Sequence, residues 1–186
     1  DTETLVDAVL MRTEQIAAPR IVDLCTGSGC IALALKSQRQ NAVVTGIERS
    51  PEALQYAQKN AAACKLDITL LHADVLYAQT AARHHELDVV VSNPPYLTAE
   101  DMLHLQQEVT HEPALALAGG ADGLHFYREI TRLWKQTLKP NGLLAYEVGY
   151  AQAEAVRAIL ADNGFTEIET VRDLNGMERV VLGRAI

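Results

Sequence analysis

Short apolar runs alternate with segments of helical periodicity along most of this chain. The runs of strand length are residues 20–25, 42–48, 68–72, 87–92 and 143–148. Between them, apolar residues recur at spacings of three and four, which is the pattern of a helix with one buried face. These segments predict helices over residues 2–13, 29–36, 50–63, 124–138 and 151–163. Strands that alternate with helices predict an α/β fold with a doubly wound, mostly parallel sheet.

Residues at the ends of these segments support the predicted boundaries. Ser50 can cap the third helix, and Pro51 suits its first helical position. Residues 139–142, Lys-Pro-Asn-Gly, predict a turn before the fifth strand. Gly164 predicts the end of the last helix, because glycine tolerates the left-handed backbone that closes many helices.

The C-terminal part of the chain predicts a hairpin. Segments 165–171 and 179–182 flank the pair Asn175-Gly176, which favours a tight turn between antiparallel strands. We therefore expect one antiparallel strand at the edge of the sheet. A longer segment, residues 97–123, is rich in histidine, glutamate and proline.

Composition narrows the class of protein. The 186 residues fit one domain, which we place at residues 1–186, and 48% hydrophobic with 22% charged residues is an ordinary globular mixture. No apolar run reaches the roughly 18 residues of a membrane span, and no secretion leader is visible. We expect a cytoplasmic protein without a membrane partner. The chain opens at Asp1 in mid-pattern, so we expect a fragment of a longer protein.

The net charge and the spacing of potential metal ligands argue against a nucleic-acid-binding protein and against a metalloprotein. Nucleic-acid binding needs a cationic surface, and the net charge of this chain is −8, so we expect no direct nucleic-acid binding. The three cysteines form no CxxC pair and indicate reduced thiols. The histidines show no ligand spacing with a carboxylate or cysteine, so we predict no metal site. The histidines meant are the five after the third strand, His84, His85, His104, His111 and His125.

A glycine-rich segment joins the first predicted strand to its helix. Residues 23–30 read Asp-Leu-Cys-Thr-Gly-Ser-Gly-Cys, and glycines at such a junction let a ligand approach the backbone closely. The alternative is a tight turn that binds nothing, because glycine matches of this kind also occur without a ligand. The candidate cofactor residues here are Cys25, Thr26, Gly27, Ser28 and Gly29.

Two acidic residues follow at the ends of the next strands. Glu48 ends the second strand 19 residues after Gly29, where a carboxylate can accept hydrogen bonds from both ribose hydroxyls of a nucleotide. That spacing suits NAD as well as S-adenosyl-L-methionine. Asp74 follows the third strand and can accept the amino group of adenine, while Val75 can pack on the ring; a capping aspartate is an equally good interpretation.

The fourth strand ends in Asn93-Pro94-Pro95-Tyr96. Two prolines fix the backbone and remove two N–H donors, so the polar groups left are largely acceptors. The Asn93 side-chain oxygen and the Pro94 carbonyl can each accept one hydrogen of a substrate NH2 group. Tyr96 can pack on the planar group that bears it. We therefore predict these four residues as the catalytic set of a methyl transfer to a planar nitrogen, with Asn93 also touching the cofactor; the alternative is a proline-rich turn.

With these motifs in place, the chain resembles the catalytic domain of the HemK/PrmC family, the release-factor glutamine methyltransferases. The similarity includes the segments above and extends over nearly the whole chain. Further matching segments are residues 2–6, Glu112-Pro113, 118–123, Tyr127-Arg128, 147–149 with Gln152, 173–174 and 178–180.

The resemblance implies a class I, Rossmann-like methyltransferase fold with a seven-stranded sheet. It also implies S-adenosyl-L-methionine as cofactor, with S-adenosyl-L-homocysteine as product. The implied substrate is the glutamine of the Gly-Gly-Gln loop in peptide chain release factors, whose N5-methylation modulates translation termination. The family's N-terminal helical domain has no counterpart in this sequence. Cys25 replaces a glycine of many members, and Glu48 replaces an aspartate.

Several alternatives remain at this stage. A sister family that methylates a glutamine of ribosomal protein L3 shares both main motifs; residues 2–6 and 173–179 favour the release-factor branch. An adenine-N6 methyltransferase of DNA or RNA would use the same Asn93 motif, but it must flip its base and usually has a basic or aromatic surface. A non-enzymatic nucleotide-binding module and a dehydrogenase have no use for that motif. Glu147, at the end of the fifth strand, is expected to orient the cofactor or the Asn93 loop; the alternative is that it caps a helix.

Overall fold

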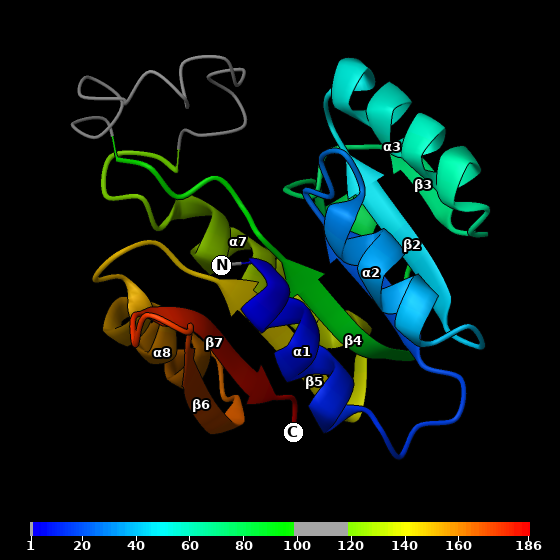
Figure 1. Cartoon of the computed structure of the whole chain (residues 1–186). Coiled ribbons are helices and arrows are strands. Elements are labelled where there is room, and N and C mark those ends of the chain that lie inside the picture. The colour runs from blue at the N-terminus through cyan, green and yellow to red at the C-terminus, as the bar shows by residue number, and fades with distance from the viewer. Residues whose placement is uncertain (1, 99–118) are drawn as a thin grey trace.

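A computed structural model describes residues 2–98 and 119–186, and it shows a central sheet covered by helices on both faces (Figure 1). The strands are β1 (Arg20–Leu24), β2 (Val43–Glu48), β3 (Thr69–His72), β4 (Leu87–Ser92), β5 (Leu138–Glu147), β6 (Thr166–Arg172) and β7 (Glu178–Arg184). The helices are α1 (Thr2–Arg12), α2 (Cys30–Gln38), α3 (Pro51–Cys64), α4 (Ala78–Ala81), α7 (His125–Trp134) and α8 (Ala153–Asp162).

The seven strands lie in the order β3-β2-β1-β4-β5-β7-β6. The first five pair in parallel, so their carboxyl ends share one edge of the sheet. The strand order reverses between β1 and β4, and a crevice at such a switch point is where open α/β sheets bind their ligands. The α/β class and the seven-stranded, mostly parallel sheet expected from the sequence are confirmed.

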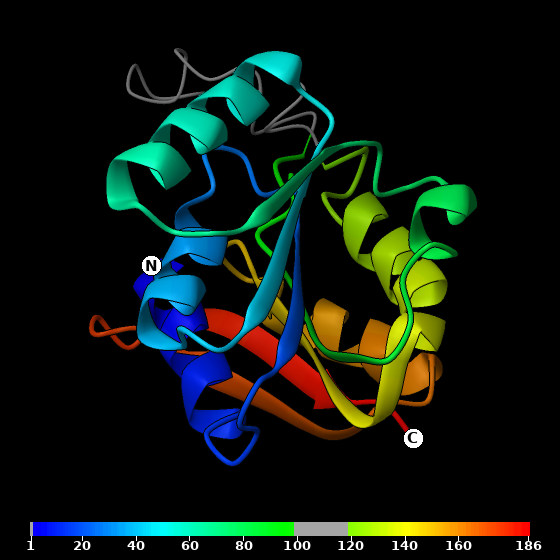
Figure 2. The ribbon, with the colours of Figure 1, turned by 90° about the vertical axis from the view of Figure 1, so that its right-hand side faces the viewer.

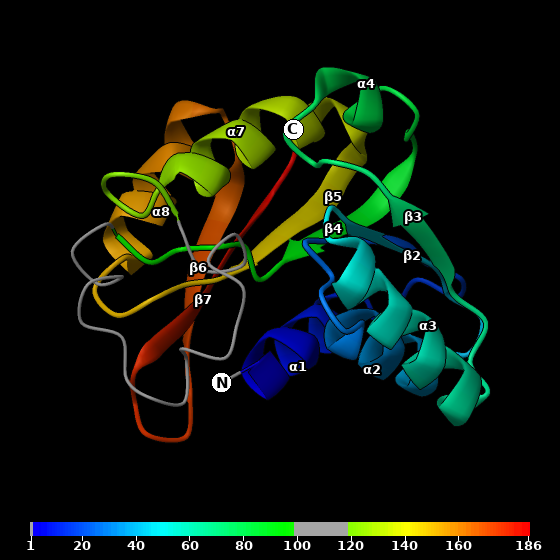
Figure 3. The same ribbon diagram turned by 90° about the horizontal axis from the view of Figure 1, so that it is seen from above.

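The sheet separates two apolar layers. Helices α1, α2 and α3 cover one face, and α4, α7 and α8 cover the other, as the views in Figures 2 and 3 show. Alternate β4 residues point into opposite layers: Val89 and Val91 pack with α1 and α2, whereas Val90 packs with α7 and α8. All six residues of β4 are buried, as expected for the central strand of a parallel sheet.

The C-terminal hairpin is confirmed at one edge of the sheet. The predicted antiparallel strand is β7, which pairs with β5 on one side and β6 on the other. It therefore lies second from the edge, because β6 takes the outermost place. The turn between them holds Gly176 at φ 80°, as the Asn-Gly pair predicts. Since β6 runs parallel to β5, this turn reaches the same edge of the sheet as Glu147.

Most element ends fall within two residues of their predicted positions. Ser50 caps α3 as expected, its Oγ accepting a hydrogen bond from Ala53 N at 3.2 Å. Gly164, at φ 75°, closes α8 through a bond from its N–H to the Ala161 carbonyl. None of the helices within the described ranges combines the length and hydrophobicity that a membrane-crossing helix needs.

Two expectations about local structure were wrong. Residues 139–142 are not a turn before the fifth strand but part of β5, which begins at Leu138. They form an irregularity in it, where the register with β4 jumps from Leu87–Leu138 to Val89–Leu143. The predicted helix over 124–138 ends as α7 at Trp134, followed by a single 3-10 turn, Lys135–Thr137.

Candidate active site at the carboxyl edge of the sheet

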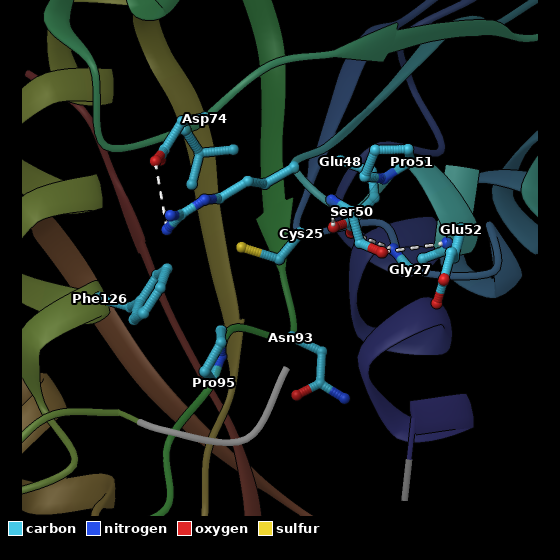
Figure 4. Close-up of a pocket in the computed structure, with 13 residues that line it drawn as sticks. Cys25, Gly27, Glu48, Ser50, Pro51, Glu52, Asp74, Asn93, Pro95 and Phe126 are labelled. Carbon is cyan, nitrogen blue, oxygen red and sulfur yellow. Dashed lines mark hydrogen bonds and ion pairs between the residues drawn. The ribbon is translucent and has the colours of Figure 1, made fainter. Parts of the chain in front are cut away.

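A cavity of about 370 Å³ opens at the switch point between β1 and β4 (Figure 4). That volume is in the range of small-molecule sites. Asp74 and Pro95 lie on opposite sides of it, with Cys25 between them, and Phe126 closes a third side. The residues that line it are Cys25, Gly27, Glu48, Arg49, Ser50, Pro51, Glu52, Ala53, Asp74, Val75, Asn93, Pro95 and Phe126.

The sequence predicted about half of this lining. Cys25, Gly27 and Asn93 stand in the wall, together with the predicted Glu48, Asp74, Val75 and Pro95. Other predicted residues belong to the same loops but not to the cavity wall. They are Thr26, Ser28, Gly29, Pro94 and Tyr96.

The glycine loop is shaped by left-handed backbone at three positions. Cys25, Gly27 and Gly29 have φ values of 58°, 57° and 85°. A Cβ on Gly29 would approach Ala57 Cβ at 3.3 Å, so this glycine also lets α2 and α3 pack closely. Apart from its chain neighbours, no heavy atom of the described residues lies within 4 Å of a Cβ built on Gly27, so the structure leaves open space beside it.

The buried carboxyl group of Asp23 holds the glycine loop in place through hydrogen bonds. Its Oδ2 accepts hydrogen bonds from the Thr26 hydroxyl and from Ala32 N, the latter at 3.2 Å. Its Oδ1 is buried and has no hydrogen-bond partner among the described residues. Complete burial, reinforced by the charge of Glu48, raises the pKa of Asp23 to about 7 despite the two hydrogen bonds.

Glu48 connects two turns at the mouth of the cavity. Its Oε2 accepts a hydrogen bond from Gly27 N at 2.9 Å, and its Oε1 accepts one from Ser50 N at 2.7 Å. The carboxylate therefore joins the glycine loop to the start of α3. Each oxygen retains further acceptor capacity, because a carboxylate offers about four lone-pair positions.

Asp74 and Val75 form the wall that was predicted to meet an adenine ring. Asp74 Oδ1 caps its own turn by accepting from Leu76 N at 2.9 Å, and Oδ2 lies 3.5 Å from the Arg49 guanidinium. The carbonyl of Val75 accepts a hydrogen bond from Trp134 Nε1 at 2.9 Å. Trp134 is fully buried, and it fixes this wall from the side of α7.

The Asn93 loop closes the other side of the cavity. Ser92 Oγ donates to the Leu24 carbonyl at 2.7 Å and so ties the end of β4 to β1. Asn93 and Pro95 then line the cavity, whereas Pro94, which is also buried, does not. Burial, with the nearby carboxylates of Glu48 and Asp23, raises the pKa of the Cys25 thiol, which disfavours its use as a nucleophile.

Some lining residues were not predicted from the sequence. Residues 49–53 follow Glu48 directly, so their place at the start of α3 beside the sheet edge was a signal that could have identified them. Phe126 is different, because it comes from α7 and reaches the cavity only through tertiary packing. Nothing in its local sequence marks it as a site residue.

Glu147 ends β5 beside the Asn93 loop, because Ser92 and Tyr146 are paired in the register. It is 5% exposed, and its Oε2 has no hydrogen-bond partner in the described part of the chain. Its backbone carbonyl accepts from the Tyr127 hydroxyl at 3.0 Å. It does not line the cavity. An orienting role for Glu147 stays a prediction.

Among residues 2–98 and 119–186, no group of three His, Cys, Asp or Glu side chains converges as metal ligands would. His84 packs against the Trp134 ring at 5.3 Å between centroids. His104, His111, Glu112-Pro113 and Ala118 lie outside the described residues. Cys25, Cys30 and Cys64 are free thiols.

Comparison with known proteins decides the family. The family model described as methyltransferase small domain matches residues 2–124. The chain belongs to the methyltransferase small domain family. Among solved structures, this methyltransferase domain is similar to TrmN from Thermus thermophilus, with a TM-score of 0.68 and 21% identity over 97% of this chain and 48% of that one. It is equally similar in fold to a methyltransferase from Pyrococcus furiosus, with a TM-score of 0.68 and 13% identity over 97% and 82% of the two chains. The class I methyltransferase fold is thus confirmed.

Curated relatives of this methyltransferase domain are more similar in sequence. One from Caulobacter vibrioides, named release factor glutamine methyltransferase, is 45% identical over 186 residues, covering 98% of this chain and 63% of that protein. One of the same name from Clostridium acetobutylicum is 40% identical over 185 residues, covering 98% and 65%. The resemblance found from the motifs is confirmed. The chain spans less than two thirds of the length of these relatives.

Proposed function

We propose that this chain is the catalytic part of an S-adenosyl-L-methionine-dependent enzyme that methylates the side-chain amide nitrogen, N5, of a glutamine in peptide chain release factors. The supporting observation is that Asn93 and Pro95 form one wall of a cavity whose other walls suit a nucleoside. The names of the relatives, release factor glutamine methyltransferase, point to the same substrate.

The cavity fits the proposed cofactor in the chemistry of its lining. Val75, Phe126 and Pro95 offer apolar surface for an adenine ring, and Glu48 and Asp74 offer carboxylate oxygens at its rim. Gly27 leaves room for a ligand against the glycine loop. When bound there, S-adenosyl-L-methionine supplies the electrophilic methyl group. Glu48 would hold the ribose hydroxyls, and Asp74 the adenine amino group.

The Asn93 loop is suited to an amide nucleophile. An amide nitrogen attacks poorly, because its lone pair is delocalised into the carbonyl. Asn93 Oδ1 and the Pro94 carbonyl would each accept one hydrogen of the substrate NH2 and turn its nitrogen toward the cavity. The same acceptors stabilise the positive charge that develops on nitrogen, and because their positions are fixed beforehand they need little reorganisation. Tyr96 would pack on the planar amide.

Release factors are preferred over other substrates with a planar NH2. The net charge of −8 does not suit a duplex-binding surface, which disfavours adenine in DNA or RNA. Ribosomal protein L3 offers a glutamine too, but the relatives described above are named for release factors. The Gly-Gly-Gln loop is therefore the proposed target.

Substitution of Asn93 tests this proposal. Asn93→Ala is expected to lower turnover on a release factor about 10²-fold or more, as loss of one preorganised partner typically does. Cofactor affinity, measured by calorimetry, should change far less, because Glu48 and the glycine loop remain. Asn41→Ala is the matched control, since Asn41 is exposed and precedes β2 at the opposite edge of the sheet.

Asn93→Asp separates the two substrate classes. It keeps an acceptor but adds a negative charge, and it should also lose activity on glutamine. Near-normal turnover of Asn93→Ala on a release factor would refute the proposed mechanism. Methylation of single-stranded DNA by Asn93→Asp that exceeds the parent's activity on any glutamine would favour an adenine methyltransferase instead.

A further inference from the structure

We propose that Gln152 is a positioning residue that fixes the backbone of the Asn93–Tyr96 loop for methyl transfer. This inference rests on the proposed function. Gln152 precedes α8, on a segment far from the loop in sequence, and its side chain is partly buried. It does not line the cavity, so its effect would pass entirely through the residues that it holds.

Both ends of the Gln152 side-chain amide are engaged. Nε2 donates to the Tyr96 carbonyl at 3.0 Å and, more weakly, to the Gly123 carbonyl at 3.4 Å. Oε1 accepts from Gly149 N at 3.1 Å. One side chain thus joins three segments: the loop after β4, the segment before α7, and the turn between β5 and α8. A planar amide with one acceptor and two donors is the group that this arrangement requires.

Three glycines let these segments approach Tyr96. A Cβ on Gly149 would lie 2.7 Å from Tyr96 Cδ2, and one on Gly119 would lie 2.7 Å from Tyr96 Cα. A Cβ on Gly123 would lie 2.5 Å from Gln152 Nε2. Any larger side chain at these positions would displace the loop. The close packing and the hydrogen bonds of Gln152 therefore constrain the same backbone.

Because Pro94 and Pro95 lie between Asn93 and Tyr96, a fixed Tyr96 backbone also restricts the positions of the Asn93 side chain and the Pro94 carbonyl. Pro94 and Pro95 lock two consecutive φ angles, so the segment from Asn93 to Tyr96 has few ways to bend. At its start, the neighbouring Ser92 is tied to β1 by the bond to the Leu24 carbonyl. At its end, Gln152 holds the Tyr96 carbonyl. Release of that end would let the Pro94 carbonyl and Tyr96 drift from the geometry that an amide substrate needs.

Two substitutions test the proposal on the intact chain. Gln152→Ala removes all three hydrogen bonds. Gln152→Glu has nearly the same shape and keeps an oxygen for Gly149 N, but it removes both donors and places a carboxylate oxygen against the Tyr96 carbonyl. Gln136→Ala is the matched control, because Gln136 also donates its side-chain amide to a backbone carbonyl, that of Leu133, but lies away from the cavity.

Turnover on a release factor should fall by about 10²-fold in both Gln152 variants, the loss expected from a misplacement of about 1 Å in a reacting group. Calorimetry should still find one S-adenosyl-L-methionine bound per chain with nearly unchanged affinity. Gln136→Ala should match the parent. A fall in turnover that merely follows a fall in binding stoichiometry would show loss of folded protein and would contradict a positioning role.

Hydrogen exchange provides a readout that does not need the substrate. Gln152→Ala should speed exchange at Gly149 and in residues 96–98, whereas Gln152→Glu should speed it in residues 96–98 but protect Gly149. Parent-like exchange at these residues together with parent-like turnover in both variants would overturn the inference. A parent chain that methylates no release factor would instead refute the proposed function, and the exchange data would still decide whether Gln152 holds the loop.

Discussion

The carboxylate of Glu48 illustrates how much one side chain contributes at this site. Its position at the end of a strand and its spacing from Gly29 were visible in the sequence. Its two hydrogen bonds, to Gly27 N and Ser50 N, were not, because they depend on how two loops meet after folding. Glu48 therefore shapes the mouth of the cavity in addition to its proposed contact with ribose.

Replacement of Glu48 should weaken cofactor binding. Hydrogen bonds to charged groups contribute about 1.5–3 kcal/mol, so Glu48→Ala should raise the Kd for S-adenosyl-L-methionine at least about tenfold. Glu52→Ala is the control, because Glu52 also lines the cavity but is exposed in the first turn of α3. Equal affinities in the two variants, measured by calorimetry, or comparable binding of NAD by the parent would count against the proposed cofactor site.

Asp23 should make stability depend on pH. Its pKa is raised from 3.8 to about 7 in the fold, so the protonated form is favoured there. The fold binds the Asp23 proton more tightly than the unfolded chain does, so this contribution to the free energy of unfolding is complete below the unfolded pKa. It is lost as pH rises through the folded pKa, a change of about 4 kcal/mol over this window. Urea unfolding should therefore show the parent losing stability from about pH 4 to about pH 7. Asp23→Asn should flatten that slope; an equally steep slope in the variant would disprove the assignment to Asp23.

At the scale of elements, the sequence predicted the strands and helices that have a strong apolar period. All five parallel strands and the hairpin are present. It failed at residues 139–142, where Pro-Asn-Gly signals a turn but the backbone stays in β5. There Asn141 N donates to the Ala185 carbonyl, and Ala185 N donates to the Gly142 carbonyl, so pairing across the sheet overrides the local signal. The four-residue helix α4 has too few residues to show a period.

The junction of β5 and α8 should tolerate no added side chain. Gly149→Ala would push a methyl group into the Tyr96 ring and should reduce methyl transfer strongly while cofactor affinity is retained. Gly183→Ala is the control in the neighbouring strand β7, where the nearest atom to an added Cβ is 3.3 Å away. Comparable turnover in both variants would show that the position of Tyr96 has no bearing on catalysis.

On the scale of the whole molecule, the topology gathers the site. Parallel strands β1, β2, β3 and β4 end at one edge, so motifs from four separate segments meet without any sequence signal between them. That much follows from the strand-helix alternation alone. The contribution of Phe126 from α7 and the contacts of Gln152 with Tyr96 could not be predicted, because they depend on packing between elements distant in sequence.

The most direct test of the central claim is tandem mass spectrometry of a peptide chain release factor incubated with this chain and S-adenosyl-L-methionine. The expected result is one added methyl group on the side-chain nitrogen of the Gly-Gly-Gln glutamine, absent when the enzyme is Asn93→Ala. A methyl group located on another residue of the release factor, or no methylation of it by a folded chain that binds the cofactor, would contradict the proposed function.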